Sequence, residues 1–345
     1  MKLKIGFLGV GSMGLSHVRA LREFCGDRAE AAAVWVSHDA RVERIRSELP
    51  GVALFREAEA LLEFALDAVF ISTPNFTHVP LALAALEAGK HVFAEKPVGI
   101  TRAECRQMLE AARRADRVVM IGHELRYSPF FQKVKALVER GEIGAPRMVW
   151  CRELRGPFQP KVDDWIQDAR RSGGALVDKN CHHFDLMNWW VGARPRRVCA
   201  FGGKAVVEVI GGEHEVNDHA AVIFEYGTGA RGALDLCLFA PDLEGEDLEM
   251  GVIGEGGLLR TRLSRLEIEV RKRGGAAAVH AVEARRGFGF GGHLGFVEIH
   301  QAFLDAILEG RRPLTTVEDC VDGTLLAIAA EESIRRGAIV ELDES

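Results

Sequence analysis

Three ionisable side chains stand in settings that suit removal of hydrogen from an alcohol. Lys96 follows a short apolar run, and Asp178 and His182 lie four residues apart in the second half of the chain. An ammonium group can stabilise a forming alkoxide, and an imidazole can act as a general base near neutral pH. Residues four apart share a helix face, so Asp178 would tune the imidazole of His182 or help to orient the substrate. We therefore interpret Lys96, Asp178 and His182 as catalytic.

Each of these residues also has a structural interpretation. Asp178 would be a helix N-cap, and His182 would be a core histidine with satisfied hydrogen bonds. We favour the catalytic interpretation because three separate features of the sequence indicate one site: Lys96, the Gly173-Gly174 pair and the Asp178/His182 pair.

The run from Cys181 through His182 and His183 to Asp185 invites comparison with a metal site. Its spacing matches no usual zinc pattern, and the reaction inferred above needs no metal, so we predict none. We interpret His183 as a packing residue and Asp185 as a structural hydrogen-bonding group.

A glycine-rich turn near the N-terminus suits a dinucleotide. Gly9, Gly11 and Gly14, with Ser12 and Met13 between the last two, form a Gly-x-Gly-x-x-Gly motif after a predicted strand and before a predicted helix. The first glycine permits a tight turn, the second lets the backbone approach a pyrophosphate, and the third allows close packing. An ordinary turn is the alternative, but this context favours NAD or NADP.

The end of the second predicted strand bears on the choice between these cofactors. An acidic residue there would bind the ribose hydroxyls of NAD. Ser37 occupies this position, and Ser37 and His38, helped by Arg41 or Arg44, would accommodate a 2′-phosphate. The residues therefore favour NADP, although Asp39 would restore a preference for NAD in a shifted register. A solvated loop and helix face is the alternative for His38 and Arg41.

Strands and helices that would position these residues alternate in the first third of the chain. The strands are Ile5–Gly9, Ala31–Val36, Ala68–Ile71, His91–Ala94 and Val118–Gly122, and the helices include Val79–Ala88 and Thr101–Ala115. This alternation predicts a parallel sheet covered on both faces.

The pattern changes after about residue 123. Helices are expected at Pro129–Arg140 and His182–Val191, and then at Phe296–Glu309 and Val317–Arg336. Strands are expected at Ala220–Glu225, Gly232–Phe239, Leu248–Ile253 and Leu266–Val270, separated by glycines that suggest an antiparallel sheet. Lys272–Ala278 is the least patterned segment. We predict domains at 1–122 and 123–345.

Composition excludes several classes of partner. The 345 residues carry a net charge of -6, with no basic footprint for nucleic acid, no basic amphipathic stretch and no apolar run long enough for a membrane. The N-terminal apolar run is too short for a signal peptide. Seven cysteines without a Cys-x-x-Cys pair indicate reduced thiols and a cytoplasmic protein.

Further motifs identify a family. Ser72-Thr73-Pro74-Asn75 follows the third long strand, His78 comes next, and Glu95-Lys96-Pro97 ends the following strand. Together with the glycine-rich turn, these motifs make the chain resemble the glucose–fructose oxidoreductase and inositol dehydrogenase family (Gfo/Idh/MocA) over nearly its whole length. The second half of the chain is similar to that family's substrate-domain motif, in the stretch Gly173-Gly174-Ala175-Leu176-Val177-Asp178 followed by His182 and Asp185.

The resemblance implies a Rossmann domain followed by an α/β domain with a large, open, predominantly antiparallel sheet. It implies that Thr73, Pro74, Asn75 and His78 belong to the nicotinamide side of the cofactor site and that Glu95 holds a ribose hydroxyl. It also assigns Lys96 as the catalytic lysine and His182 to the position of the base. Residues 179–181, Lys-Asn-Cys, depart from the apolar-Gly-apolar pattern of many members, and this departure bears on the substrate.

The substrate would be met by polar and aromatic side chains. Trp165 would stack on a sugar ring, and Asp164 and Asn180 suit a polyhydroxylated ligand; a buried tryptophan and an exposed acidic loop are the alternatives. The full set of candidate contacts is Lys96, Arg126, Tyr127, Asp163, Asp164, Trp165, Asn180, His182 and His293.

The resemblance implies an NAD(P)-dependent oxidoreductase that transfers a hydride between nicotinamide and a secondary hydroxyl or keto carbon of a sugar, inositol or related polyol. One alternative is an NAD-dependent glycosidase that uses transient redox chemistry. Another is a cofactor-binding sensor, which would not need Lys96, Asp178 and His182 together. Because family members commonly cover the open sheet with another subunit, a homodimer or homotetramer is expected.

Overall fold

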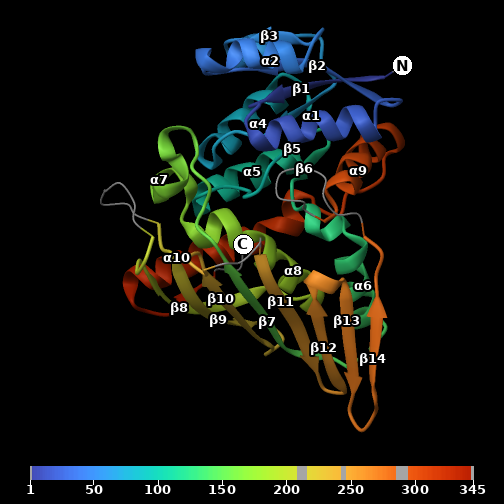
Figure 1. The fold of residues 1–345 in the computed structure, drawn as a ribbon, viewed down its shortest axis with the longest axis vertical. Helices are drawn as coiled ribbons and strands as arrows, with labels where there is room; N and C mark the ends of the chain where they lie inside the picture. The colour runs from blue at the N-terminus through green and yellow to red at the C-terminus, as the bar shows by residue number, and fades with distance from the viewer. Residues whose placement is uncertain (1, 208–215, 242–245, 285–293, 343–345) are drawn as a thin grey trace. The chain divides into compact units, whose positions relative to one another are not determined.

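The computed structural model describes residues 2–207, 216–241, 246–284 and 294–342, with the side chain of Glu246 excepted. The chain forms two compact units (Figure 1). The first comprises Met1–Tyr127 and Arg285–Val321, and the second comprises Ser128–Ala284 and Asp322–Ser345. None of the described helices combines the length and apolar character needed to span a bilayer.

The first unit is built on a six-stranded parallel sheet with the order β3-β2-β1-β4-β5-β6. Its strands are β1 (Leu3–Leu8), β2 (Ala29–Trp35), β3 (Ala53–Phe55), β4 (Ala68–Ile71), β5 (His91–Ala94) and β6 (Val119–Ile121). Its helices are α1 (Ser12–Phe24), α2 (Val42–Glu48), α3 (Ala58–Leu62), α4 (His78–Glu87), α5 (Arg102–Arg114) and α9 (Phe296–Glu309). The strand order reverses between β1 and β4, and ligands of such sheets bind at the carboxyl ends of the strands at this point.

The core of this unit explains why its strands are apolar runs. Phe7, Phe70 and Phe93, on three adjacent strands, are fully buried and stack in sequence, with ring centroids 5.3 and 4.4 Å apart. Phe303 of α9 meets the edges of Phe70 and Phe93. Helix α9 therefore completes the core of the N-terminal sheet although it lies near the end of the chain.

The second unit is built on a nine-stranded mixed sheet, with the order β14-β13-β12-β11-β7-β10-β9-β8-β15. The strands are β7 (Pro146–Arg155), β8 (Pro195–Gly203), β9 (His219–Tyr226), β10 (Arg231–Cys237), β11 (Glu246–Gly254), β12 (Gly257–Arg262), β13 (Glu267–Lys272), β14 (Ala277–Ala281) and β15 (Val340–Glu341). Among the described strand pairs of this second sheet, only β7–β10 is parallel.

Helices cover one face of this sheet, as Figure 1 shows: α6 (Pro129–Glu139), α8 (Cys181–Val191) and α10 (Val317–Arg336). A short helix, α7 (Ala169–Ser172), precedes the turn that leads to α8. The opposite side carries exposed apolar residues, among them Met148, Phe201 and Ile223, each more than half exposed. This unit thus leaves a large, partly apolar sheet face uncovered by its own helices.

The predicted fold class is confirmed, including the parallel N-terminal sheet and the predominantly antiparallel second sheet. Sequence analysis missed β7 because the fully buried Glu153 interrupts the inward row formed by Val149 and Cys151. It also interpreted 272–278 as an unpatterned segment, whereas β13 and β14 pair across it as a hairpin.

Candidate active site

The predicted site residues fall into two groups, one in each unit. The glycine-rich turn, the loops after β4 and β5 and Lys96 belong to the first unit. Asp178, Asn180 and His182 belong to the second unit.

The glycine-rich turn has the geometry of a dinucleotide cradle. Gly9 has φ +90°, and a Cβ there would lie 2.8 Å from Thr73 Cγ2. A Cβ on Gly14 would lie 2.0 Å from the carbonyl oxygen of Gly9, whereas one on Gly11 would meet only the guanidinium of Arg41, at 3.6 Å. Gly9 and Gly14 are therefore required for the turn to close, and Gly11 leaves its backbone open to an approaching group. No acidic residue stands in the first turn of α1, so its N-terminus suits the phosphates of NAD or NADP.

The end of β2 places the residues that would meet the adenosine ribose. The guanidinium of Arg56 donates to the carbonyl groups of Val36 and Ser37 and pairs with the carboxylate of Asp39. Ser37 and His38 are exposed. Asp39 is therefore engaged by Arg56, and Arg41 lies against the glycine-rich turn, where a phosphate would approach.

The cation Arg41 differs from its neighbour on the same segment. Arg44 donates to the carboxylate of Glu48 at 2.6 Å, whereas Arg41 makes no ion pair within the ranges that the structure describes. Of the two arginines named by sequence analysis, Arg41 is thus the better candidate for an anionic ligand.

The loops after β4 and β5 are tied together by His78. Its Nε2 donates to the carbonyl oxygen of Thr73 at 2.9 Å, and its Nδ1 lies 3.5 Å from the carbonyl oxygen of Pro97. Burial lowers the pKa of His78, so the neutral imidazole is the stable form. His78 thereby holds the Thr73-Pro74-Asn75 loop next to the turn that carries Lys96, whose peptide bond to Pro97 is cis.

Glu95 and Lys96 follow β5 directly, at the carboxyl end of the sheet. Glu95 is buried, and Gly122, just after β6, makes room for it, since a Cβ on that glycine would lie 2.9 Å from Glu95 Oε1. The same oxygen lies 3.0 Å from Nε2 of His17 on α1, and Nδ1 of His17 lies 2.9 Å from Nε2 of His300 on α9. Sequence analysis missed both histidines, because each stands on a buried helix face where an apolar residue is the ordinary occupant.

In the second unit, two glycines and a buried acid shape the backbone before Asp178. Gly173 and Gly174 have φ +88° and +103°. A Cβ on Gly174 would lie 2.4 Å from Oε1 of Glu331, which accepts the backbone N–H of Leu176 at 2.9 Å. Burial raises the pKa of Glu331 to about 7. The glycine pair thus lets this carboxyl group reach the start of the next element.

That element is a π-helical turn, Leu176–Asn180, which leads into α8. Asp178 lies within the π turn and His182 in the first turn of α8, and both are buried. The expected succession of helical turns is present, although the first of them is wider than an α-helix. Single π turns inside helices are frequent at functional sites.

A buried acid on β7 anchors the residues that follow Asp178. Glu153 is fully buried; its Oε2 accepts a hydrogen bond from Asn180 Nδ2 at 2.8 Å, and its Oε1 lies 3.4 Å from Nζ of Lys179. Nδ1 of His183 lies 3.4 Å from Glu153 Oε2 and 3.1 Å from Asn180 Nδ2. Lys179 and Asn180, which depart from the family pattern, therefore share Glu153 as a partner. The signal in the sequence that could have revealed this partner is an acidic residue at an inward-facing position of a strand.

The remaining predicted substrate contacts have different surroundings. Arg126 is buried and donates to the carbonyl oxygens of Leu314 and Asp319, and the hydroxyl of Tyr127 accepts the backbone N–H of Leu314 at 2.9 Å. Burial raises the pKa of Tyr127 to about 12. Both side chains therefore brace the loop before α10 within the first unit.

The acidic loop before α7 has an unusual backbone. Asp163 and Asp164 adopt left-handed conformations with φ +52° and +45°, and Trp165 is half-buried beside them. Non-glycine residues with positive φ are uncommon and often mark functional loops. His293, the last predicted contact, lies outside the described residues.

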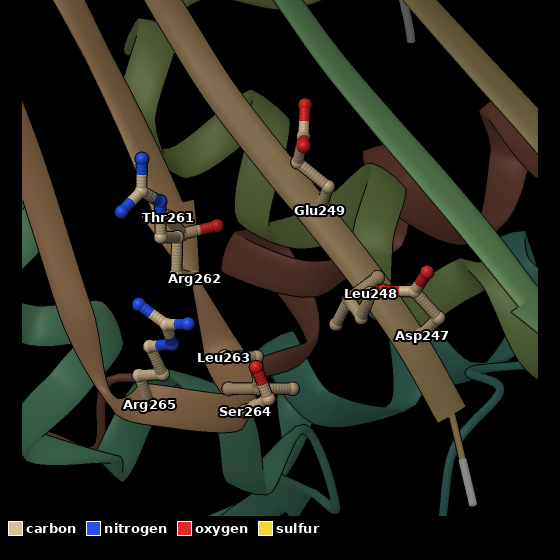
Figure 2. A pocket seen from close by; sticks show the side chains of 8 residues that line it. All are labelled: Asp247, Leu248, Glu249, Thr261, Arg262, Leu263, Ser264 and Arg265. Atoms are coloured by element: carbon tan, nitrogen blue, oxygen red, sulfur yellow. The ribbon is translucent and has the colours of Figure 1, made fainter.

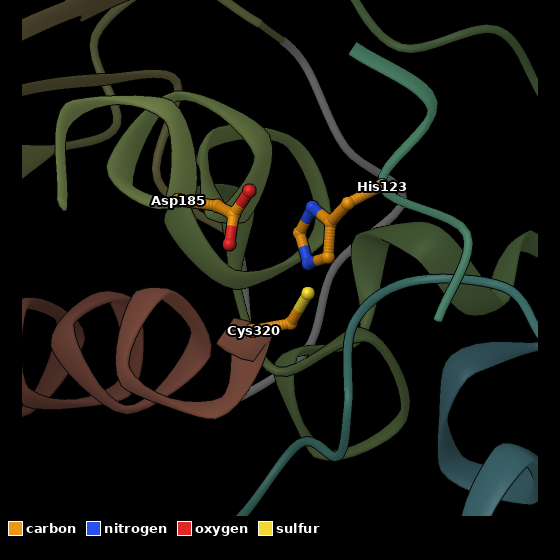
Figure 3. A group of neighbouring side chains, drawn as sticks. All are labelled: His123, Asp185 and Cys320. Atoms are coloured by element: carbon orange, nitrogen blue, oxygen red, sulfur yellow. The ribbon is translucent and has the colours of Figure 1, made fainter. Parts of the chain in front are cut away.

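Two further features concern metals and cavities. His123, after β6, and Cys320, in the first turn of α10, are buried in the first unit and bring a ring nitrogen and the thiol sulfur within 4.8 Å of each other (Figure 3). Asp185, also drawn there, belongs to α8 in the second unit, where Gly323 leaves room for it. The absence of a metal stays a prediction.

A surface hollow of about 310 Å³ lies on the second unit between β11 and the end of β12 (Figure 2). It is lined by Asp247, Leu248, Glu249, Thr261, Arg262, Leu263, Ser264 and Arg265. None of the predicted site residues belongs to this lining, so the hollow is separate from the candidate active site.

Comparisons with known proteins agree with these motifs. Residues 3–123 match the model of an oxidoreductase family with an NAD-binding Rossmann fold, and residues 131–260 match the GFO/IDH/MocA C-terminal domain. The chain is 29% identical to the myo-inositol 2-dehydrogenase of Thermotoga maritima over 99% of both chains. It is 31% identical to inositol 2-dehydrogenase 3 of Saccharopolyspora erythraea over 75% of this chain and 73% of that one.

A solved structure shows the same fold along the whole chain. The oxidoreductase domain protein of Kribbella flavida has a TM-score of 0.86 and 25% identity, over 99% of this chain and 100% of that one. Both halves of the chain thus match one family, and the protein belongs to the Gfo/Idh/MocA oxidoreductases, enzymes with an NAD-binding Rossmann domain that act on CH–OH groups.

Proposed function

We propose that this protein is an NAD(P)-dependent dehydrogenase of a polyol, with an inositol or a related sugar as its substrate. The observation that carries the proposal is the occurrence, in one chain, of a dinucleotide cradle, Lys96 after β5, and the buried residues Asp178 in a π turn and His182 in the helix that follows it. The similarity to inositol 2-dehydrogenases along the chain supports the choice of substrate class. These relatives are dehydrogenases, and nothing in them favours the glycosidase alternative.

The roles of the side chains follow from their chemistry. Bound nicotinamide supplies the acceptor for the hydride. Nε2 or Nδ1 of His182 takes the hydroxyl proton, and Asp178 orients that imidazole. The ammonium group of Lys96 stabilises the oxygen as it gains negative charge. Burial of both members of the Asp178/His182 pair keeps water from competing for the proton.

Substrate recognition is proposed to depend on the sequence Lys179-Asn180. With Nδ2 of Asn180 bonded to Glu153, the amide is held in one orientation. A fixed amide can discriminate between epimers of a cyclic polyol, since a site built to hydrogen-bond a hydroxyl rejects analogues that lack it. Trp165, Asp164, Arg126, Tyr127 and His293 stay candidates for further substrate contacts.

For the cofactor, we propose a preference for NADP. Ser37 and His38 are exposed at the end of β2, Asp39 is engaged by Arg56, and Arg41 lies at the glycine-rich turn. A cation without a carboxylate partner beside neutral polar groups suits a 2′-phosphate better than a bare ribose.

We also propose how the chain is organised as an enzyme. Residues 1–122 would bind the dinucleotide, and residues 123–345 would bind the substrate and form a homodimer or homotetramer through the uncovered sheet face that carries Met148 and Ile223. All seven cysteines are free thiols, which suits the cytoplasm. Light scattering of the protein and of an Ile223→Arg variant would test the assembly, since a monomeric variant is expected.

The function is tested by spectrophotometry. Purified protein would be mixed with a panel of inositols, hexoses, uronates and amino sugars, each with NAD⁺ and with NADP⁺, while formation of reduced nicotinamide is followed by absorbance. Turnover of an inositol or sugar is expected, with higher kcat/KM for NADP⁺. Absence of turnover across the panel from protein that binds the cofactor would contradict the proposal, and aryl glycosides would then be the next substrates to try.

A further inference from the structure

A chain of three buried side chains runs from the end of β5 into α9 within the first unit. Glu95 Oε1 and His17 Nε2 are 3.0 Å apart, and His17 Nδ1 and His300 Nε2 are 2.9 Å apart. His300 Nδ1 lies 2.6 Å from the backbone carbonyl oxygen of Phe296. Both histidines are fully buried.

The end of this chain fixes the hydrogens on Nδ1 of His300 and on Nδ1 of His17. A carbonyl oxygen only accepts, so Nδ1 of His300 carries a hydrogen, and in a neutral imidazole Nε2 is then an acceptor. His17 must therefore donate to it from Nδ1. If His17 is neutral as well, its Nε2 is bare, and the hydrogen between that atom and Glu95 belongs to the carboxyl group.

Counting protons leaves two possible sites for the last of them. Three hydrogen bonds need three protons, and two neutral imidazoles supply two. The third proton must reside on Glu95 or must convert a histidine to an imidazolium. The chain is thus neutral overall, with one proton more than a carboxylate and two neutral histidines would hold.

The surroundings of His17 disfavour the imidazolium. Its ring lies among the rings of Phe70, Phe93 and Phe296, with centroids 4.9 to 5.4 Å away, and none of its surface is exposed. Burial lowers the pKa of His17 to about 3, and burial together with the neighbouring His17 lowers that of His300 to about 3. Glu124 opposes this effect at His17 but is the smaller influence. A buried ion pair would have to offset the desolvation of both charges.

We propose that Glu95 is a neutral carboxylic acid in the folded protein and that His300, through the tautomer it imposes on His17, is the positioning residue that keeps the proton there. Glu95 then donates to His17 Nε2 from Oε1. It adds no negative charge beside Lys96 or the phosphates of a dinucleotide. The proton count does not depend on which polyol the enzyme oxidises.

His300→Phe is the variant that separates the two charge states. Without an acceptor for Nδ1, His17 is expected to adopt the Nε2–H tautomer and donate to Glu95, which can then ionise. Phe303→Leu, on the same helix and in the same core, is the matched control because its ring packs against Phe70 and Phe93 and contributes no proton or acceptor to the chain. Glu95→Gln is a second test, since an amide N–H donates to His17 Nε2 as the acid does and should leave the tautomer of His17 unchanged.

Infrared spectroscopy of protein labelled with ¹³C-carboxyl glutamate detects a protonated carboxyl group directly. Glu331, whose pKa is also raised, would contribute a second signal, so the measurement is made near pH 7 in a Glu331→Gln background. The acid carbonyl band is expected in this background and with Phe303→Leu, and should vanish with Glu95→Gln or His300→Phe. No band in the background protein, or a band that persists with His300→Phe, would overturn the proposal.

Two measurements remain decisive if His300→Phe does not fold. Nitrogen NMR of ¹⁵N-histidine protein is expected to show His17 with Nδ1 protonated and Nε2 bare, both in the unmodified protein and in Glu95→Gln. A doubly protonated His17, or an Nε2–H tautomer, in the unmodified protein would overturn the proposal.

The affinity for the dinucleotide gives a third readout where the variant folds. A new carboxylate attracts the positively charged oxidised ring and not the reduced one. The ratio of reduced to oxidised dissociation constants is therefore expected to rise by about threefold or more in His300→Phe. An unchanged ratio there would contradict a change of charge at Glu95, and Phe303→Leu should leave the ratio unaltered.

Discussion

The carboxyl group of Glu331 holds the backbone N–H of Leu176 across 155 positions of the chain, at 2.9 Å. Its second oxygen accepts a hydrogen bond from Asn217 Nδ2 at 3.1 Å. Leu176 begins the π turn that contains Asp178, so a buried acid in α10 determines where that turn starts. The proposed catalytic pair, Asp178 and His182, thus follows a backbone hydrogen bond to a residue that does not belong to the motif.

The first prediction concerns stability against pH. The pKa of Glu331 is raised from 4.5 to about 7, so the folded protein holds this proton more tightly than the unfolded chain does. The resulting stabilisation is fully present below about pH 4.5 and is lost as the pH rises through 7. A shift of this size corresponds to roughly 3 kcal/mol over that window. Glu331→Gln, which cannot ionise, should remove this decline.

Urea unfolding at several pH values between 5 and 8 would measure how the free energy of unfolding declines as the pH rises. Glu332→Gln, on the adjacent position of α10 but paired with Arg336 at the surface, is the control and should keep the slope of the unmodified protein. Equal slopes for Glu331→Gln and Glu332→Gln would contradict the assignment.

The second prediction concerns the glycine that faces Glu331. Gly174→Ala would place a Cβ 2.4 Å from the Glu331 carboxyl oxygen, at a backbone φ of +103°. The collision and the unfavourable φ together should cost at least about 3 kcal/mol. Gly192→Ala, with φ +69° and no atom within 4 Å of the new Cβ, isolates the conformational cost, about 1–2 kcal/mol. Denaturant titration of both variants would show whether Gly174→Ala lowers the free energy of unfolding more than Gly192→Ala does.

The third prediction concerns cofactor choice. Arg41→Ala should weaken NADP⁺ binding by about tenfold, because loss of one charge-assisted contact is worth about 1.5 kcal/mol, and should change NAD⁺ binding by less than about threefold. Arg44→Ala removes an arginine that is already paired with Glu48 and should affect neither. Calorimetric titration with the two cofactors measures both effects. Equal losses for NAD⁺ and NADP⁺ in Arg41→Ala would show that Arg41 contacts the shared pyrophosphate instead.

Much of the fold was predictable because patterns within short stretches of sequence determine it. The parallel strands are apolar runs since both of their faces are buried, and the turn at Gly9 needs a residue that tolerates φ +90°. The candidate site was predictable where a motif is contiguous, as at Glu95-Lys96-Pro97. Each of these signals lies within a few residues of the feature it determines.

The missing parts are interactions between distant positions. Glu153 meets residues 179–183, Glu331 meets Leu176, and His17 meets His300 across 283 positions. A single buried polar residue in a strand or helix indicates that a partner exists, but it carries no information on where that partner lies. These pairs were therefore accessible only from the three-dimensional structure.

The fourth prediction tests the proposed catalytic role of Lys96. Lys96→Met keeps the length of the side chain but removes the ammonium, so kcat should fall by about 10²–10⁴-fold because the forming alkoxide loses its stabilising charge. Affinity for the dinucleotide, measured by calorimetry, should change by less than about threefold, or 0.7 kcal/mol. Lys272→Met removes an exposed lysine paired with Glu142 and should leave kcat intact. A Lys96→Met enzyme with normal kcat would exclude this residue from the chemistry.

The fifth prediction separates the structural and the recognition roles of Glu153. Glu153→Leu leaves the ammonium of Lys179 beside an apolar group in the interior of the second unit and should destabilise the fold by about 3–5 kcal/mol. Glu153→Leu combined with Lys179→Met removes the two charges of that pair and should recover part of the loss, because an apolar pair can replace a buried ion pair without cost. Recovery is incomplete because Arg155, whose Nη1 lies 3.9 Å from Glu153 Oε1, loses the same carboxylate.

The same double variant should not recover substrate binding. Asn180 has lost the carboxylate that fixes its amide, so KM for the polyol should stay raised while kcat returns toward normal. Urea unfolding measures the first effect and steady-state kinetics the second. If the double variant recovered KM together with stability, Glu153 would serve the fold alone, and the orientation of Asn180 would have to come from the shape of the π turn.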